Sequence, residues 1–217
     1  MLGVVTIGQT PRPDLVEVFG RHAPGAEIRT LGALDGLSPA EASALALPDA
    51  YPLLVRLADG GTAHVPLATL APLVERRARE LADQGAAVIV VACAGAFPAI
   101  QCGAPVLLPG TLLPGVVRAV TRTGRIGIVT PLEEQVRAAR EKWTDDGFLV
   151  KVTWASPYDE AEMEAAVAAM RDPSLEVVVL DCMGHGDEYR DRFAERCGRP
   201  VVLAQSIVAR VAGGLVS

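Results

Sequence analysis

Wholly apolar segments of strand length, separated by helix-like stretches, limit this chain to an α/β fold. Val88–Ala92 and Val177–Leu180 contain no polar residue, and Leu67–Gln84 carries apolar residues at helical spacing. Strands that are apolar on both faces are typical of parallel sheets covered by helices on both sides. The sequence therefore predicts an α/β architecture with mostly parallel sheets.

The two halves of the chain carry the same short patterns at matching places. Gly3–Thr6 (GVVT) is matched by Gly127–Thr130 (GIVT), and Val88–Gly95 (VIVVACAG) is matched by Val177–Gly184 (VVVLDCMG). Each half thus opens with a strand that ends in threonine and later contains a strand that ends in Cys-x-Gly. We expect two similar lobes.

The lobes are expected over residues 1–108 and 109–217, with the option that the C-terminal segment packs back on the first lobe. The first half is the longer one, which we attribute to a hairpin inserted around residues 51–66. Its turn is Asp59-Gly60-Gly61, because Asp-Gly and Gly-Gly adopt the positive φ angles of tight turns.

Composition and charge disfavour several classes of partner. The formal net charge is −6 at pH 7 and aromatic residues make up 4% of the chain, whereas nucleic-acid binding needs clustered Lys and Arg and aromatic platforms. A basic, apolar leader is lacking, as is a run of about 20 apolar residues, so we expect a cytoplasmic protein that does not bind membranes. The four cysteines are expected to be thiols, and without a CxxC pair no metal site is predicted.

Both repeated cysteines follow a predicted parallel strand, at the edge where open parallel sheets bind ligands. Cys93 and Cys182 are therefore expected to face each other across a ligand cleft between the lobes. A carbon held between two thiols can lose a proton on one face and regain it on the other, without a metal or cofactor. We expect the glycine-containing turn after each cysteine to open a helix, whose N–H groups lower the thiol pKa and bind an anion. The alternative for each cysteine is a small apolar residue of the core.

Polar groups at the same edge are candidates for substrate binding. Arg12 lies in the loop after the first strand, and its guanidinium suits a carboxylate, although a solvated surface arginine is an equal alternative. His185 is interpreted either as a group that activates Cys182 or binds ligand, or as a partly exposed loop histidine. The residues predicted to bind substrate are Gln9, Thr10, Arg12, Ala94, Gly95, Thr130, Met183, Gly184 and His185.

Three segments resemble the AroM family, a branch of the aspartate/glutamate/hydantoin racemase superfamily. They are Thr6–Pro13 (TIGQTPRP), Leu31–Ser38 (LGALDGLS) and Val179–Gly184 (VLDCMG), and the resemblance covers essentially the whole chain. It implies two flavodoxin-like lobes related by a pseudo-twofold, cofactor-free chemistry and a catalytic cysteine from each lobe. Members of the superfamily include racemases, a maleate cis–trans isomerase and arylmalonate decarboxylases, which act on small carboxylates or hydantoins.

The sequence departs from the amino-acid racemases of that superfamily at both cysteines. Those enzymes commonly have Asn-Thr after the first cysteine and Cys-Thr-His at the second. Here Ala94-Gly95 follows Cys93, and Met183-Gly184-His185 follows Cys182. The departures argue against an α-amino acid as substrate.

These observations predict a cofactor-independent racemase or isomerase acting on a small carboxylate or hydantoin-like substrate, with Cys93 and Cys182 as the acid/base pair. The expected partner is a small anionic metabolite, and the sequence leaves a homodimer open. One alternative is a non-catalytic sensor of small anions, which needs neither thiol. Another is a decarboxylase or cis–trans isomerase that uses a single cysteine.

Overall fold

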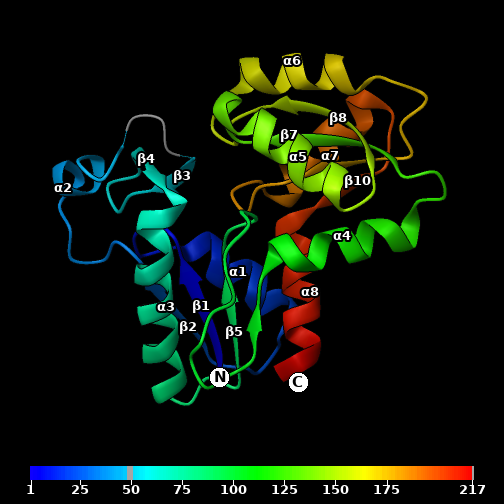
Figure 1. Ribbon diagram of the computed structural model, residues 1–217. Coiled ribbons are helices and arrows are strands. Elements are labelled where there is room, and N and C mark those ends of the chain that lie inside the picture. The colour runs from blue at the N-terminus through cyan, green and yellow to red at the C-terminus, as the bar shows by residue number, and fades with distance from the viewer. Residues whose placement is uncertain (48–50, 217) are drawn as a thin grey trace. The chain divides into compact units, whose positions relative to one another are not determined.

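The computed structural model describes residues 1–47 and 51–216 (Figure 1). The chain divides into two compact units. Unit 1 comprises residues 1–110 and 208–217, and unit 2 comprises residues 111–207. Among the described residues, no helix is long and apolar enough to cross a membrane.

Unit 1 is built on a four-stranded parallel sheet in the order β2-β1-β5-β6. Its strands are β1 (Leu2–Thr6), β2 (Ile28–Gly32), β5 (Val88–Val91) and β6 (Val106–Leu107). Its helices are α1 (Pro13–His22), α2 (Pro39–Ser43) and α3 (Leu67–Asp83). The predicted hairpin is present as two antiparallel strands, β3 (Pro52–Arg56) and β4 (Thr62–Pro66).

Unit 2 also contains a four-stranded parallel sheet, in the order β10-β9-β7-β8. Its strands are β7 (Arg125–Thr130), β8 (Leu149–Trp154), β9 (Val177–Leu180) and β10 (Val201–Leu203). Its helices are α5 (Val136–Asp145), preceded by the 3-10 turn η1 (Glu133–Gln135), α6 (Glu160–Met170) and α7 (Asp187–Cys197). Two further helices, α4 (Pro109–Val120) and α8 (Ala204–Val216), have residues in both units.

The sequence repeat corresponds to one topology used twice. Within each four-stranded sheet, the strand that comes first in the chain lies between the sheet's second and third strands, and the fourth strand pairs with the third. The register is also the same, because Gly3 of β1 lies opposite Ile89 and Gly127 of β7 lies opposite Val178. The prediction of an α/β fold with two mostly parallel sheets is confirmed.

The repeated glycine of β1 and β7 has a packing role in both units. A Cβ atom on Gly3 would lie 3.1 Å from the side chain of Leu81 on α3, and a Cβ on Gly127 would lie 2.5 Å from the sulfur of Met170 on α6. Glycine therefore lets a helix approach the central strand closely in each unit.

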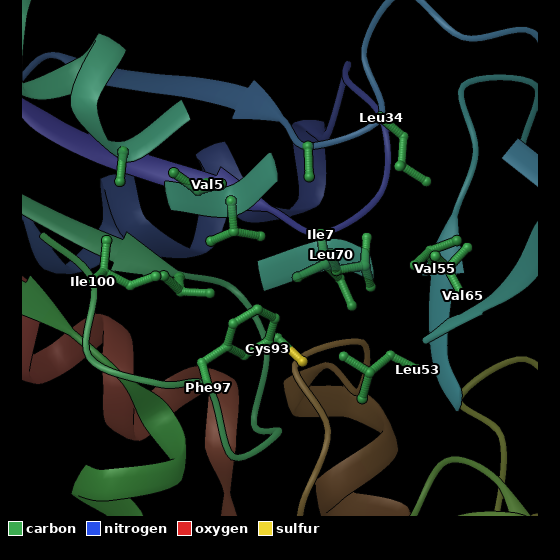
Figure 2. Close-up of a cluster of buried hydrophobic side chains, with 14 of the residues drawn as sticks. Val5, Ile7, Leu34, Leu53, Val55, Val65, Leu70, Cys93, Phe97 and Ile100 are labelled. Carbon is green, nitrogen blue, oxygen red and sulfur yellow. The ribbon is translucent and has the colours of Figure 1, made fainter. Parts of the chain in front are cut away.

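The hairpin extends the core of unit 1 instead of standing apart from it. Every second residue of β3 is buried, which is the pattern of a strand with one face on the core. Figure 2 shows Leu53 and Val55 of β3 and Val65 of β4 in the same cluster as Val5 of β1 and Leu70 of α3. This packing holds the hairpin next to the loops that follow β1 and β5.

Candidate functional site

Cys93 lies two residues beyond the end of β5, at the carboxyl edge of the unit 1 sheet. Its side chain is buried in the core cluster of unit 1, and Figure 2 shows it between Phe97 and Leu53. The backbone N–H of Gly95 points at the sulfur, with a nitrogen–sulfur distance of 3.4 Å. An N–H donor favours a thiolate over a thiol, because it interacts more strongly with a charged acceptor.

The helix expected directly after Cys93 is absent, and that prediction was wrong. Residues 94–105, all of which the structure describes, contain no helix, and α4 begins only at Pro109. The two prolines and two glycines of this segment explain the irregular backbone, since proline lacks an N–H and glycine is costly to order in a helix. The polar support for Cys93 therefore includes the N–H of Gly95, but no helix starts at the cysteine.

Cys182 lies two residues beyond β9 in unit 2 and repeats this local arrangement. The N–H of Gly184 points at its sulfur, with a nitrogen–sulfur distance of 3.3 Å. Cys182 is half-buried, in contrast to the buried Cys93. Helix α7 begins at Asp187 with Gly186 at its N-cap, so here a helix does open shortly after the cysteine.

The loop after Cys182 is held by two residues at the start of α8 that the sequence analysis missed. Gln205 donates a hydrogen bond from Nε2 to the carbonyl oxygen of Met183 at 2.9 Å, and Ser206 donates from its hydroxyl to Asp187 at 2.7 Å. Both Gln205 and Ser206 are buried. The available signal was their place directly after the short apolar run Val201–Leu203, which is β10 in the structure, at the edge where parallel sheets bind ligands.

Gln9 joins three segments of unit 1 through its side-chain amide. Its Nε2 donates to the carbonyl oxygens of Leu34 at 3.0 Å and Leu37 at 2.6 Å, while its Oε1 accepts from the N–H of Ala58 at 3.0 Å. Its own backbone N–H donates to the carbonyl of Arg56 at 2.9 Å. The side chain of Gln9 therefore connects the loop that follows β1 to the loop that follows β2 and to the turn of the hairpin.

Thr10 is tied to Asp35, a residue that the sequence analysis did not single out. The backbone N–H of Thr10 donates to one carboxylate oxygen of Asp35 at 2.8 Å, and its hydroxyl donates to the other at 3.0 Å. The second oxygen also accepts from the N–H of Gly32 at 2.7 Å. Asp35 lies in the segment Leu31–Ser38, whose sequence carried part of the family resemblance.

Arg12 is buried and contacts two polar side chains of its own unit. Its Nε and Nη2 donate to the carboxylate of Asp14 at 2.9 and 2.6 Å, and its Nη1 donates to the hydroxyl of Thr6 at 3.1 Å. Burial acts to raise the pKa of Asp14, but the hydrogen bonds and charge of Arg12 outweigh it and the pKa lies below its ordinary value. The alternative of a solvated arginine does not apply, because Arg12 is only 8% exposed.

Thr130 ends β7 as Thr6 ends β1, and both threonines are buried. The hydroxyl of Thr130 donates to the carbonyl of Leu132 at 3.0 Å. That of Thr6 accepts from the N–H of Gly8, with an oxygen–nitrogen distance of 3.4 Å. In each unit the strand-ending threonine thus shapes the first turn of the following loop.

His185 is fully buried beside Tyr189, with 4.4 Å between the ring centroids. Neither imidazole nitrogen has a hydrogen-bond partner among the described residues, and the same holds for the Tyr189 hydroxyl. Burial lowers the pKa of His185 to about 4, although the nearby backbone of Ala155 and Cys182 acts in the opposite direction. Burial likewise raises the pKa of Tyr189. Both groups are therefore neutral at pH 7, and His185 offers Cys182 no positive charge.

Asp181, next to Cys182, contacts helix α5. One of its carboxylate oxygens accepts from Nε1 of Trp143 at 2.9 Å and lies 3.5 Å from Nζ of Lys142. Asp181 therefore links the end of β9 to helix α5. In the described part of the chain, no three His, Cys, Asp or Glu side chains gather in a way that could hold a metal ion.

Comparisons with known proteins identify a family and a group of solved structures with a similar fold. The family model described as AroM protein matches residues 2–216. A search of curated proteins finds no match.

Three of the similar solved structures differ in the activity that their names state. A mutant of arylmalonate decarboxylase in its liganded form is 15% identical with a TM-score of 0.69, over 100% of this chain and 92% of that one. Allantoin racemase from Pseudomonas fluorescens is 20% identical with a TM-score of 0.64, over 99% and 90%. Glutamate racemase from Aquifex pyrophilus is 16% identical with a TM-score of 0.62, over 100% and 84%. At these identities the likeness shows a shared fold.

Proposed function

The chain belongs to the AroM protein family, and we propose that it is a cofactor-independent racemase or isomerase of a small carboxylate or hydantoin-like substrate. One observation carries the proposal. Cys93 and Cys182 occupy equivalent positions after β5 and β9, and each sulfur receives the N–H of the glycine two residues on. Two thiols at equivalent positions, each with an N–H donor at its sulfur, suit a two-base proton transfer.

The similar structures support this class of chemistry. Their names describe racemases of allantoin and of glutamate, a maleate isomerase and an arylmalonate decarboxylase. All four activities concern small carboxylates or a hydantoin-type ring. A cytoplasmic location fits a mechanism that depends on reduced thiols.

In the proposed mechanism one cysteine is a thiolate and the other is a thiol. The thiolate removes the proton from a carbon next to a carboxylate or imide carbonyl, and the bond electrons pass into the carbonyl to form a planar enolate. The thiol then donates its proton to the opposite face of that carbon. The product is the mirror-image centre, and Cys93 and Cys182 have exchanged their protonation states.

The remaining predicted residues are assigned to the substrate. Arg12 supplies positive charge for a carboxylate, and backbone amides after each cysteine stabilise the enolate oxygen. Gln9 acts through the loop that it holds, because its side chain binds backbone groups of Leu34, Leu37 and Ala58. The groups proposed to contact substrate are Thr10, Arg12, Ala94, Gly95, Thr130, Met183, Gly184 and His185.

A second candidate is a decarboxylase or isomerase that uses Cys182 alone. It is favoured by the difference in burial, since Cys93 is 8% exposed and packs in the core cluster whereas Cys182 is only half-buried. In that mechanism Cys182 donates one proton to an enolate formed by loss of CO₂, and Cys93 contributes packing.

Incubation with a substrate panel in D₂O separates these functions. The panel contains single enantiomers of allantoin, 5-benzylhydantoin and glutamate, together with the achiral compounds maleate and phenylmalonate. Each reaction is followed by NMR and, for the chiral compounds, by chiral chromatography. A racemase incorporates deuterium at the stereocentre while the enantiomers equilibrate. Loss of CO₂ with one deuterium fixed in the product indicates the single-cysteine enzyme. Thermal stabilisation by a panel member without exchange or turnover contradicts both and indicates a sensor.

A further inference from the structure

We propose that Gln205 is a positioning residue that aims the N–H of Gly184 at the sulfur of Cys182 and thereby stabilises the Cys182 thiolate. The inference rests on the proposed function, in which that thiolate is a base. It adds to the predicted site a residue that lies more than 20 positions after Cys182 in the sequence.

The register of the unit 2 sheet brings the start of α8 to the same sheet edge as the loop that carries Cys182. Strands β9 and β10 pair in parallel with Leu203 opposite Leu180. Each strand ends at this pair, and two residues further on lie Gln205, in the first turn of α8, and Cys182, in the loop after β9. The side chain of Gln205 spans from the start of α8 to the Cys182 loop and donates from Nε2 to the carbonyl oxygen of Met183 at 2.9 Å.

The peptide between Met183 and Gly184 transmits this contact to the sulfur. A trans peptide is planar, and its C=O and N–H point in opposite directions. Gln205 holds the carbonyl end at 2.9 Å, and the N–H end points at Cys182 Sγ with a nitrogen–sulfur distance of 3.3 Å. Fixing the carbonyl therefore fixes the direction of the N–H.

Burial makes the contact difficult to replace. Gln205 is 5% exposed and Met183 is 4% exposed, so water has little access to the carbonyl once the amide donor is removed. The peptide is then expected to rotate toward another partner for its carbonyl, which turns the N–H of Gly184 away from the sulfur. Because this N–H stabilises the thiolate more than the thiol, we expect its loss to make Cys182 a weaker acid.

The test measures the acidity of Cys182 without any substrate. Iodoacetamide alkylation of the full chain is followed as a function of pH on the tryptic peptide of residues 172–190, which contains Cys182 and no other cysteine. The variant Gln205→Met keeps the length of the side chain and removes its donor. We expect the pH of half-maximal alkylation rate to rise by about one unit, the size of one lost hydrogen bond to a charged group.

Two further variants keep the test decisive. Gln205→Leu is a second apolar replacement that lacks a donor for the Met183 carbonyl and adds no charge, so its profile should also shift upward. Ser206→Ala is the matched control, because it removes a contact of the same helix turn to Asp187, not to Met183, and should leave the profile unchanged. Circular dichroism establishes that each variant is folded.

The inference is overturned if a folded Gln205→Met or Gln205→Leu protein has the parent profile, or if Ser206→Ala shifts it equally. These outcomes do not depend on turnover. Undiminished racemisation by Cys182→Ala would instead remove the proposed function and leave the alkylation result standing.

Discussion

Replacing Gln9 by leucine removes the side-chain amide that joins three segments of unit 1. Three hydrogen bonds of 3.0, 2.6 and 3.0 Å are lost, and the backbone groups of Leu34, Leu37 and Ala58 lose their partner. A hydrogen bond contributes about 1 kcal/mol net, and a buried group left unpaired costs about 1–3 kcal/mol. Since Leu37 and Ala58 keep some access to water, we expect a loss of about 3 kcal/mol in the free energy of unfolding. For a chain of this size that lowers Tm by about 6–12 °C.

Thermal and urea unfolding of Gln9→Leu measure this loss, and hydrogen exchange of residues 52–66 reports whether the hairpin loosens first. The matched control is Gln84→Leu, because Gln84 is exposed and its side chain accepts a hydrogen bond from the exposed Arg29. We expect the control to change stability by less than about 0.5 kcal/mol. A Tm for Gln9→Leu within 2 °C of the parent would show that Gln9 does not hold these segments together.

Two further predictions concern stability. His185 has a folded-state pKa of about 4, below the ordinary value of 6.5, so the unfolded chain binds a proton that the folded chain excludes. Stability should fall by up to about 3 kcal/mol as the pH drops from 6.5 to 4, and His185→Phe should remove that part of the pH dependence in urea titrations. A Cβ on Gly8 would lie 2.1 Å from the carbonyl oxygen of Arg56, so Gly8→Ala should cost about 3 kcal/mol or more, whereas Gly115→Ala in the open face of α4 should stabilise by about 0.5–1 kcal/mol. Equal effects of the two glycine substitutions would contradict the close approach.

The repeat and most of the elements were predictable from sequence because apolar periodicity is a local signal. The apolar strands β5 and β9 lie where it placed them, and α3 ends within one residue of the predicted limit. Helix α4 was not anticipated because Pro114 lies inside it, where proline disfavours a helix, although Pro109 stands at its first position, where proline is common. The capping box of Ser38 and Glu41 at the start of α2 is a local sequence signal for the beginning of a helix.

The chemistry of the candidate site was less accessible than its location. The positions of the two cysteines followed from strand polarity alone. The contacts that determine what the polar residues do were not predictable, because their partners are distant in sequence. Gln9 bonds to Ala58, 49 residues away, and Gln205 bonds to Met183, 22 residues away. No local pattern indicates that either amide will be buried.

The most direct test of the proposed function compares Cys93→Ala and Cys182→Ala in D₂O, with both enantiomers of whichever panel compound the parent racemises. In a two-base mechanism each thiol serves one face of the carbon, so both variants should lose racemisation by more than the 10²–10⁴-fold expected for one assisting base. Each variant should still exchange the α-proton of one enantiomer, and the two variants should act on opposite enantiomers. Full racemisation by Cys93→Ala, with loss only in Cys182→Ala, would contradict the paired mechanism and assign the chemistry to Cys182 alone.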